Sequence, residues 1–333
     1  MRNISESSRP KPLPPRGGCL PTAGRERNLD VEKGFSFNSK LLLFGEYGLM
    51  FDAMALSIPF PKFSGFLDFD PDHSHSQSTA EIRKFYEHLK SGDSHRKLHF
   101  SFDRESLKTD LNSRLFFNSN IPQQYGVGSS GALVAALFSR YMNEDSDTLL
   151  TPELLKADFA LLESYFHGRS SGLDPLISFL NQPLLLDSAK TIRPVEFDLA
   201  QTGLSVALID TKTTGPTAPL VEHFIDRLNV PEFKTEFEQQ FIPANNGCIE
   251  SLLQYNQTAF FQSLEKLIQF QIEHFRKMIP GDFHALISQA LNEKVFIKLL
   301  GSGGGGFLLA FAESETVIEN WSASRGIELL KVV

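Results

Sequence analysis

The pattern of apolar and polar positions predicts that the first half of the chain mixes strands and helices. Short apolar runs typical of strands cover residues 35–44, 55–60, 63–69, 97–102 and 114–118. Apolar residues recur at helical spacing over residues 79–90, 129–141 and 151–166. The third of these helices has a clear start signal, because Thr151 can act as the N-cap and Pro152 suits the first helical position.

In the second half, the order of the predicted elements indicates one kind of sheet. Strands are expected at residues 204–210, 295–300, 307–312 and 327–332, and helices at residues 258–276 and 314–322. Further helical sequence follows the first of these strands. The order is therefore β-α-β-β-α-β, as in a split βαβ or ferredoxin-like unit, with extra helices in the first crossover.

Residues 1–34 differ from the rest of the chain in composition. Prolines and glycines recur there without apolar periodicity, and no apolar run resembles the core of a secretory signal. On composition alone we interpret this segment as a disordered tail or as the product of a start codon assigned too early. An arginine-rich transit peptide is the alternative, although the prolines disfavour an amphipathic helix.

Composition and charge narrow the classes of function. The chain has 333 residues, 41% of them hydrophobic, which is enough for about two domains with sizeable cores. A formal net charge of −8 disfavours non-specific nucleic-acid binding, and no apolar run approaches the ~18 residues of a membrane span. The two cysteines, Cys19 and Cys248, allow neither a disulfide framework nor a cysteine-based zinc site, and a cytoplasmic location fits.

Two segments, residues 126–131 and 301–306, match the glycine pattern G-x-G-x-x-G. A dinucleotide site needs a strand before this pattern, a helix after it and an acidic residue about 20 residues further on, at the end of the next strand. The second segment is followed by a strand. The first is followed, at that distance, by a predicted loop that enters another helix. The chain also lacks the Gly-Lys-Ser/Thr pair of the usual P-loop.

The first segment nevertheless has the properties of a phosphate site. Gly126 and Gly128 permit positive φ, and Ser129 and Ser130 open a helix whose N–H groups favour an anion. Their hydroxyls could also reach a hydrated Mg²⁺. A tight loop capped by serine is an equally good interpretation of this segment alone. The second segment has five glycines in six positions, which favours backbone packed against a nucleotide or another loop over a flexible hairpin tip.

Four motifs, in order, resemble those of the GHMP-superfamily kinases. They are Lys40–Gly48 (KLLLFGEYG), Ile121–Ala132 (IPQQYGVGSSGA), Glu163–Pro175 (ESYFHGRSSGLDP) and Lys298–Phe307 (KLLGSGGGGF). The third resembles the H-G-x-P-S-G-x-D stretch of mevalonate kinases, and the chain is most similar to the bacterial members of that family. The resemblance covers residues 35–333. It implies an α+β, GHMP-kinase two-domain fold, with an N-terminal mixed α/β domain over residues 35–200 and a C-terminal ferredoxin-like domain over residues 201–333.

The resemblance also implies roles for individual residues. Lys40 and Asp174 match the catalytic lysine and aspartate, and the aspartate is the expected base. Ser130 and Glu163 match Mg²⁺ ligands. The ATP-binding residues are expected to be Gly126, Val127, Gly128, Ser129, Ser130 and Gly131. The residues expected to contact the acceptor are Lys40, Glu46, Tyr47, Asp174 and Thr217. The third family motif contains Gly301, Ser302, Gly303, Gly304 and Gly305.

The residue types agree with this chemistry. Phosphoryl transfer to an alcohol needs charge neutralisation, in-line positioning and an acceptor for the hydroxyl proton. A cation such as Lys40 beside Asp174 would keep that carboxylate ionised. Taken singly, Asp174 could be an ordinary N-cap, Glu163 a solvated helix residue and Lys40 an exposed strand lysine. Their joint occurrence with two glycine loops favours the catalytic interpretation.

The implied activity is ATP-dependent phosphorylation of mevalonate, with Mg²⁺ as cofactor and with ATP and mevalonate as small-molecule partners. Whether the protein forms a homodimer stays open. The sequence departs from the family pattern at Asn38-Ser39 (usually Pro-Gly), at Tyr47 (often His) and at Ser170 (usually Pro). The alternatives are another GHMP kinase, acting on phosphomevalonate, a sugar or homoserine, and a catalytically silent nucleotide-binding regulator.

Overall fold

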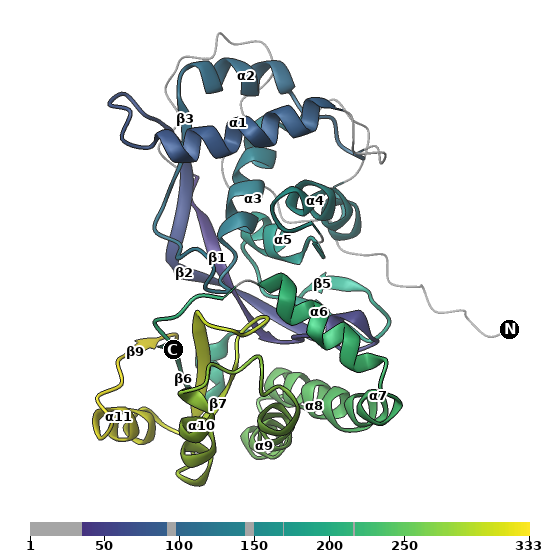
Figure 1. The fold of residues 1–333 in the computed structure, drawn as a ribbon, viewed down its shortest axis with the longest axis vertical. Helices are drawn as coiled ribbons and strands as arrows, with labels where there is room; N and C mark the ends of the chain where they lie inside the picture. The colour runs from purple at the N-terminus through teal and green to yellow at the C-terminus, as the bar shows by residue number, and fades with distance from the viewer. Residues whose placement is uncertain (1–34, 92–97, 144–149, 169, 216) are drawn as a thin grey trace, which may run out of the picture.

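The computed structural model describes residues 35–91, 98–143, 150–168, 170–215 and 217–333, so the segment interpreted as a tail lies outside the described residues. Two antiparallel sheets organise the molecule (Figure 1). One is built from strands of the first 200 residues and the other from strands of the last 130 or so. Helices α3 and α5 pack against the first sheet, and helices α9, α10 and α11 against the second.

The first sheet has the order β1-β2-β4-β5, with β3 also paired to β2. Its strands are β1 (Phe37–Phe44), β2 (Ala55–Phe69), β3 (Leu115–Ser119), β4 (Leu184–Leu186) and β5 (Ile192–Pro194). Strand β1 occupies one edge of β2, and β4 and β3 pair with the beginning and the end of the other edge. The long β2 therefore holds this sheet together.

The prediction of two separate strands before and after residue 61 was wrong. Strand β2 is continuous, although it contains Pro59 and Pro61. Its pairing with β1 shifts register between Asn38 and Ser39, which leaves residues 61–63 outside the regular ladder. An irregularity of this kind accommodates a proline, which has no N–H to donate.

The helices of the first half are mostly those that the apolar spacing predicts. They are α1 (Ser76–Ser91), α2 (Arg104–Asn112), α3 (Ser129–Tyr141), α4 (Pro152–His167) and α5 (Leu173–Leu180). The start of α4 is confirmed, because Thr151 accepts a hydrogen bond from the Leu154 N–H (3.3 Å). The strand expected at residues 97–102 was wrong: residues 98–102 contribute one isolated bridge, from Phe102 to Met142, and α2 follows.

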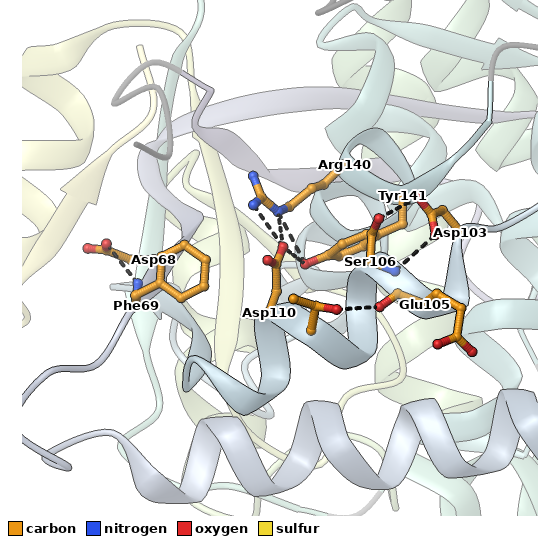
Figure 2. Close-up of polar contacts among 9 residues, drawn as sticks. Asp68, Phe69, Asp103, Glu105, Ser106, Asp110, Arg140 and Tyr141 are labelled. Carbon is orange, nitrogen blue, oxygen red and sulfur yellow. Dashed lines mark hydrogen bonds and ion pairs between the residues drawn. The ribbon is translucent and has the colours of Figure 1, made fainter. Parts of the chain in front are cut away.

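A polar cluster joins α2 to the C-terminal end of α3 (Figure 2). The Arg140 guanidinium donates to the Asp110 carboxylate (Nε to Oδ2, 2.9 Å), and the Tyr141 hydroxyl donates to the same oxygen (2.7 Å). Asp103 is the N-cap of helix α2, and its side chain accepts a hydrogen bond from the Ser106 N–H (2.9 Å). These contacts fix the C-terminal end of α3. Its N-terminal end points toward the motifs described below.

The second sheet confirms the predicted ferredoxin-like order. Its strands are β6 (Ser205–Asp210), β7 (Phe296–Leu299), β8 (Phe307–Ala312) and β9 (Leu329–Lys331), arranged β7-β8-β6-β9 with every neighbour antiparallel. The crossover from β6 to β7 contains α6 (Thr217–Leu228), α7 (Pro231–Glu236), α8 (Ile242–Leu253), α9 (Gln257–His274) and α10 (Phe283–Asn292). Helix α11 (Glu315–Ala323) connects β8 to β9.

One aromatic core reaches from the first sheet into the second half of the chain. The Phe44 ring at the end of β1 lies 5.9 Å from the rings of both Phe260 in α9 and Phe311 in β8. Many of the 30 phenylalanines belong to this core. A second core cluster fills the space between the first sheet and α1–α5. Among the described residues, every helix is too short or too polar to cross a membrane.

Candidate active site

Lys40 and Asp174 form an ion pair at the centre of the candidate site. Lys40 lies in β1 and is 4% exposed, while Asp174 lies in the first turn of α5. The Lys40 Nζ is 3.0 Å from the Asp174 Oδ1, and the aspartate side chain remains 35% exposed. The buried lysine therefore fixes a carboxylate that a ligand from solvent can still reach.

The glycine loop before α3 packs directly against this pair. Gly128 is the N-cap of α3, with φ at +81°, and the backbone N–H of Lys40 donates to the Val127 carbonyl (3.0 Å). A Cβ atom on Gly128 would lie 2.9 Å from the Lys40 Cγ, and one on Gly131 would lie 2.8 Å from the Asp174 Cβ. Only glycine allows this approach. The first N–H groups of a helix have no partner within it, so the start of α3 offers donors and a positive dipole end beside Lys40 and Asp174.

Ser130 and Glu163 meet on the same side of the loop. The Ser130 hydroxyl donates to the Glu163 Oε1 (3.1 Å), and the Ser170 hydroxyl donates to the other oxygen of that carboxylate. Glu163 is only 4% exposed. Burial and the nearby negative charge of Asp174 raise its pKa to about 7, against the opposing effect of the two serines and Lys40.

The side-chain oxygens of Ser130 and Glu163 fit a Mg²⁺ ion. A serine hydroxyl and a carboxylate are the hard oxygen ligands that Mg²⁺ prefers. The raised pKa of Glu163 means that its negative charge lacks full compensation, and a cation at this place would supply it. Among the described residues no cluster of three or more His, Cys, Asp or Glu side chains is arranged for a metal. A Mg²⁺ ion would thus depend on further oxygens from phosphates and water, as Mg²⁺ in kinase sites generally does.

The third family motif forms a loop between β7 and β8 that packs against other loops. A Cβ on Gly305 (φ +147°) would lie 2.6 Å from the Thr213 carbonyl oxygen, and one on Gly306 would lie 2.7 Å from the Tyr125 Cα. The Gly306 N–H donates to the Thr213 carbonyl (2.7 Å). The glycine run suggested backbone packed against a nucleotide or against another loop. The structure shows it packed against another loop. Through Tyr125 the motif also borders the glycine loop of α3.

Glu46 and Tyr47 both direct their polar atoms toward the third motif. The Glu46 carboxylate forms an ion pair with Lys298 in β7, and the Tyr47 hydroxyl donates to the Ser302 carbonyl (2.6 Å). Burial raises the pKa of Glu46 and lowers that of Lys298, while their mutual attraction opposes both shifts. The predicted contact of Glu46 and Tyr47 with an acceptor stays a prediction. So does that of Thr217, the first residue of α6, whose side chain lies outside the described part.

Lys298 is the residue that the motifs alone did not single out. It is fully buried, and it also donates to its neighbour's carbonyl, that of Leu299 (2.6 Å). The signal was available, because a single lysine inside the apolar run 295–300 must find a buried partner. The identity of that partner, 252 positions earlier, has no local signal.

Comparison with known proteins gives matches at three levels. Residues 94–182 match the family model described as the GHMP kinases N terminal domain. A curated relative, a mevalonate kinase of Dictyostelium discoideum, is 21% identical over 168 residues, which is 48% of this chain and 43% of the relative's length. The chain thus aligns with less than half of that relative.

Solved structures match over most of the chain. A mevalonate kinase of L. major in complex with R-mevalonate has a TM-score of 0.62 at 18% identity, covering 89% of this chain and 94% of its own. A phosphomevalonate kinase of Streptococcus pneumoniae in complex with phosphomevalonate and AMPPNP has a TM-score of 0.58 at 16% identity, covering 89% and 98%. These matches confirm the GHMP-kinase resemblance and the predicted fold class. The division at residues 200 and 201 stays a prediction.

Proposed function

We propose that this chain, which has the GHMP-kinase fold and matches the GHMP-kinase N-terminal domain at residues 94–182, is an ATP-dependent kinase of a small alcohol, with mevalonate as the acceptor. The observation that carries the proposal is the Lys40–Asp174 ion pair at the start of α3. It brings a buried cation, a reachable carboxylate and a helix N-terminus together. These three elements can supply the charge neutralisation, the phosphate site and the proton acceptor that phosphoryl transfer to an alcohol needs.

In the proposed mechanism, the first turn of α3 and the loop 126–131 bind the phosphates of ATP through backbone N–H groups. Ser130 and Glu163 would hold Mg²⁺, and the ion would supply neutralisation of phosphate charge. Asp174 accepts the proton of the acceptor hydroxyl as its oxygen attacks the γ-phosphorus and the bond to ADP breaks. Lys40 holds the Asp174 carboxylate in place through the ion pair.

The choice of mevalonate rests on the third motif and on the relatives. The stretch from His167 to Asp174 resembles the mevalonate kinase pattern, and both the curated relative and the similar L. major structure are mevalonate kinases. Another of the similar structures is a phosphomevalonate kinase, so the acceptor has to be tested directly. The cytoplasmic location is likewise part of the proposal.

The test is a coupled assay of ADP release with MgATP and a panel of mevalonate, phosphomevalonate, galactose and homoserine. We expect turnover with mevalonate and little with the others. In Asp174→Asn, kcat should fall by at least about 100-fold while nucleotide binding is kept, since general-base catalysis contributes ~10²–10⁴-fold. Faster turnover with phosphomevalonate would keep the mechanism and change the acceptor. Absence of ADP release with every acceptor, or a near-normal kcat in Asp174→Asn, would refute the proposal.

A further inference from the structure

The turn that follows β1 is attached to the third motif by a buried ion pair. The Glu46 and Lys298 side chains are 1% and 0% exposed, and their charged groups are in direct contact. Isolated buried charges are very costly, so each of the two requires the other. Because Glu46 follows β1 and Lys298 belongs to β7, this pair links the turn after the first strand of one sheet to a strand of the other sheet.

A second attachment lies one residue further along the turn. The Tyr47 hydroxyl donates to the Ser302 carbonyl (2.6 Å) within the third-motif loop itself. The Tyr47 ring packs against Phe224 (4.6 Å between ring centres) and Phe275 (5.1 Å). Tyr47 has φ at +59°, a conformation that a tyrosine adopts only when its surroundings hold it there. Several contacts therefore hold the tyrosine in place, and its hydroxyl binds the third-motif loop.

The third-motif loop, residues 301–306, packs in turn against the glycine loop at residues 126–131, which is the expected phosphate loop. A Cβ on Gly126 would lie 3.2 Å from the Leu300 carbonyl oxygen, and Gly306 lies against the Tyr125 backbone. Both contacts are between backbones, so the two loops are in close contact and the position of one limits that of the other. A continuous set of contacts thus leads from residues 46 and 47, through residues 298–306, to the loop at residues 126–131.

We propose that Glu46, Tyr47 and Lys298 are positioning residues that anchor the third-motif loop and, through it, hold the phosphate loop in its nucleotide-binding shape. We call these three side chains the loop anchor. This inference deepens the proposed kinase function and rests on it for the identity of the nucleotide. It differs from the family-based expectation, because it assigns Glu46 and Tyr47 to nucleotide binding and not to acceptor contact.

The discriminating variant is Tyr47→Phe, which removes only the hydroxyl and keeps the ring packing. The matched control is Tyr255→Phe, at a tyrosine that is 43% exposed and stacked on Phe197. Titration calorimetry with MgADP should show affinity about three- to tenfold lower for Tyr47→Phe, the usual effect of one lost hydrogen bond, and no change for the control. The KM for mevalonate should stay within about twofold of wild type.

Hydrogen exchange tests the anchor without any ligand. Amides of residues 126–131 and 301–306 should exchange faster in Tyr47→Phe than in wild type or Tyr255→Phe. The double variant Glu46→Gln/Lys298→Met should show the same two effects, because replacing both charges avoids leaving one of them unpaired.

Two results would overturn the anchor: unchanged exchange of both loops in Tyr47→Phe, or a raised KM for mevalonate with unchanged MgADP affinity. The second result would restore the acceptor-pocket role of Tyr47. A wild-type protein that neither binds MgADP nor phosphorylates an acceptor would refute the kinase function instead, and the exchange comparison would still decide whether the loop anchor exists.

Discussion

The ammonium group of Lys40 lies in a buried strand, where its charge is balanced by Asp174 at 3.0 Å. Lys40→Met keeps most of the side-chain volume and removes the charge. If Lys40 acts on the transition state, kcat should fall by about 100-fold or more, with a smaller change in the KM values. Steady-state kinetics measure both, and Lys62→Met, at an exposed lysine of β2, is the matched control. Equal losses in the two variants would show that Lys40 has no special role.

Glu163 predicts a pH-dependent effect on stability. Its pKa is raised from 4.5 to about 7, so the folded protein holds this proton more tightly than the unfolded chain does. The stability contributed by the protonated form is complete below pH 4.5 and is lost as the pH rises through about 7. Glu163→Gln stays neutral and should therefore be more stable than the metal-free wild type at pH 8, by about 1 kcal/mol or more, but not at pH 4.5.

Thermal melts of the metal-free protein at the two pH values test this expectation. For a protein of this size, 1 kcal/mol corresponds to about 1.5 °C in the midpoint. Glu250→Gln, at an exposed glutamate of α8, removes the same charge without the burial and should show no pH-dependent gain. A stabilisation of Glu163→Gln that is the same at both pH values would mean that Glu163 does not titrate in this range.

At the scale of single elements, helix α3 depends on a glycine at its start. In Gly128→Ala the new Cβ would lie 2.9 Å from the Lys40 Cγ, in addition to the strain of a positive φ. Gly326→Ala is the matched control, since Gly326 also has a positive φ (+63°) and open space around its Cβ position. We expect Gly326→Ala to lose about 1 kcal/mol of stability and Gly128→Ala to lose more, and only Gly128→Ala to lose most of its kcat. Parallel activity losses would exclude a specific effect on Lys40.

Elements with strong local signals were the ones that the sequence predicted well. The bounds of α3 and β8 are those expected, and the start of α4 follows from Thr151 and Pro152. Helix α2 was missed, because its capping signal at Asp103 lies next to an apolar run that suggested a strand. The continuity of β2 was missed because Pro61 lies in an irregular part of the ladder that only the pairing with β1 defines.

At the scale of the whole molecule, the candidate site could likewise be predicted only where the signal was local. The four motifs and their order could be recognised from local residue types, and the structure brings Lys40, Asp174, Ser130 and Glu163 together. The loop anchor could not be predicted, because Glu46 and Lys298 are 252 positions apart and each alone resembles an ordinary charged residue. Long-range pairing of this kind is determined by the fold and not by local sequence.

The shared aromatic core predicts that the two halves of the chain unfold together. Phe44 in β1 packs on Phe260 and Phe311, so the first sheet completes the core of the second half. Trp321, the only tryptophan, lies in α11, and its fluorescence reports on the second half, whereas far-UV circular dichroism reports on the whole chain. In urea, both signals should change at one midpoint.

Phe44→Ala sharpens this prediction. It should lower the free energy of unfolding by about 3–5 kcal/mol, the usual cost of removing a buried phenylalanine. It should also move the two midpoints together, although Trp321 is in the other half of the chain. Phe66→Ala, at a phenylalanine of β2 that is 36% exposed, should have a much smaller effect. If circular dichroism showed a second transition that the fluorescence of Trp321 does not follow, the halves would be independent folding units. The contact through Phe44 would then be an interface between domains and not a common core.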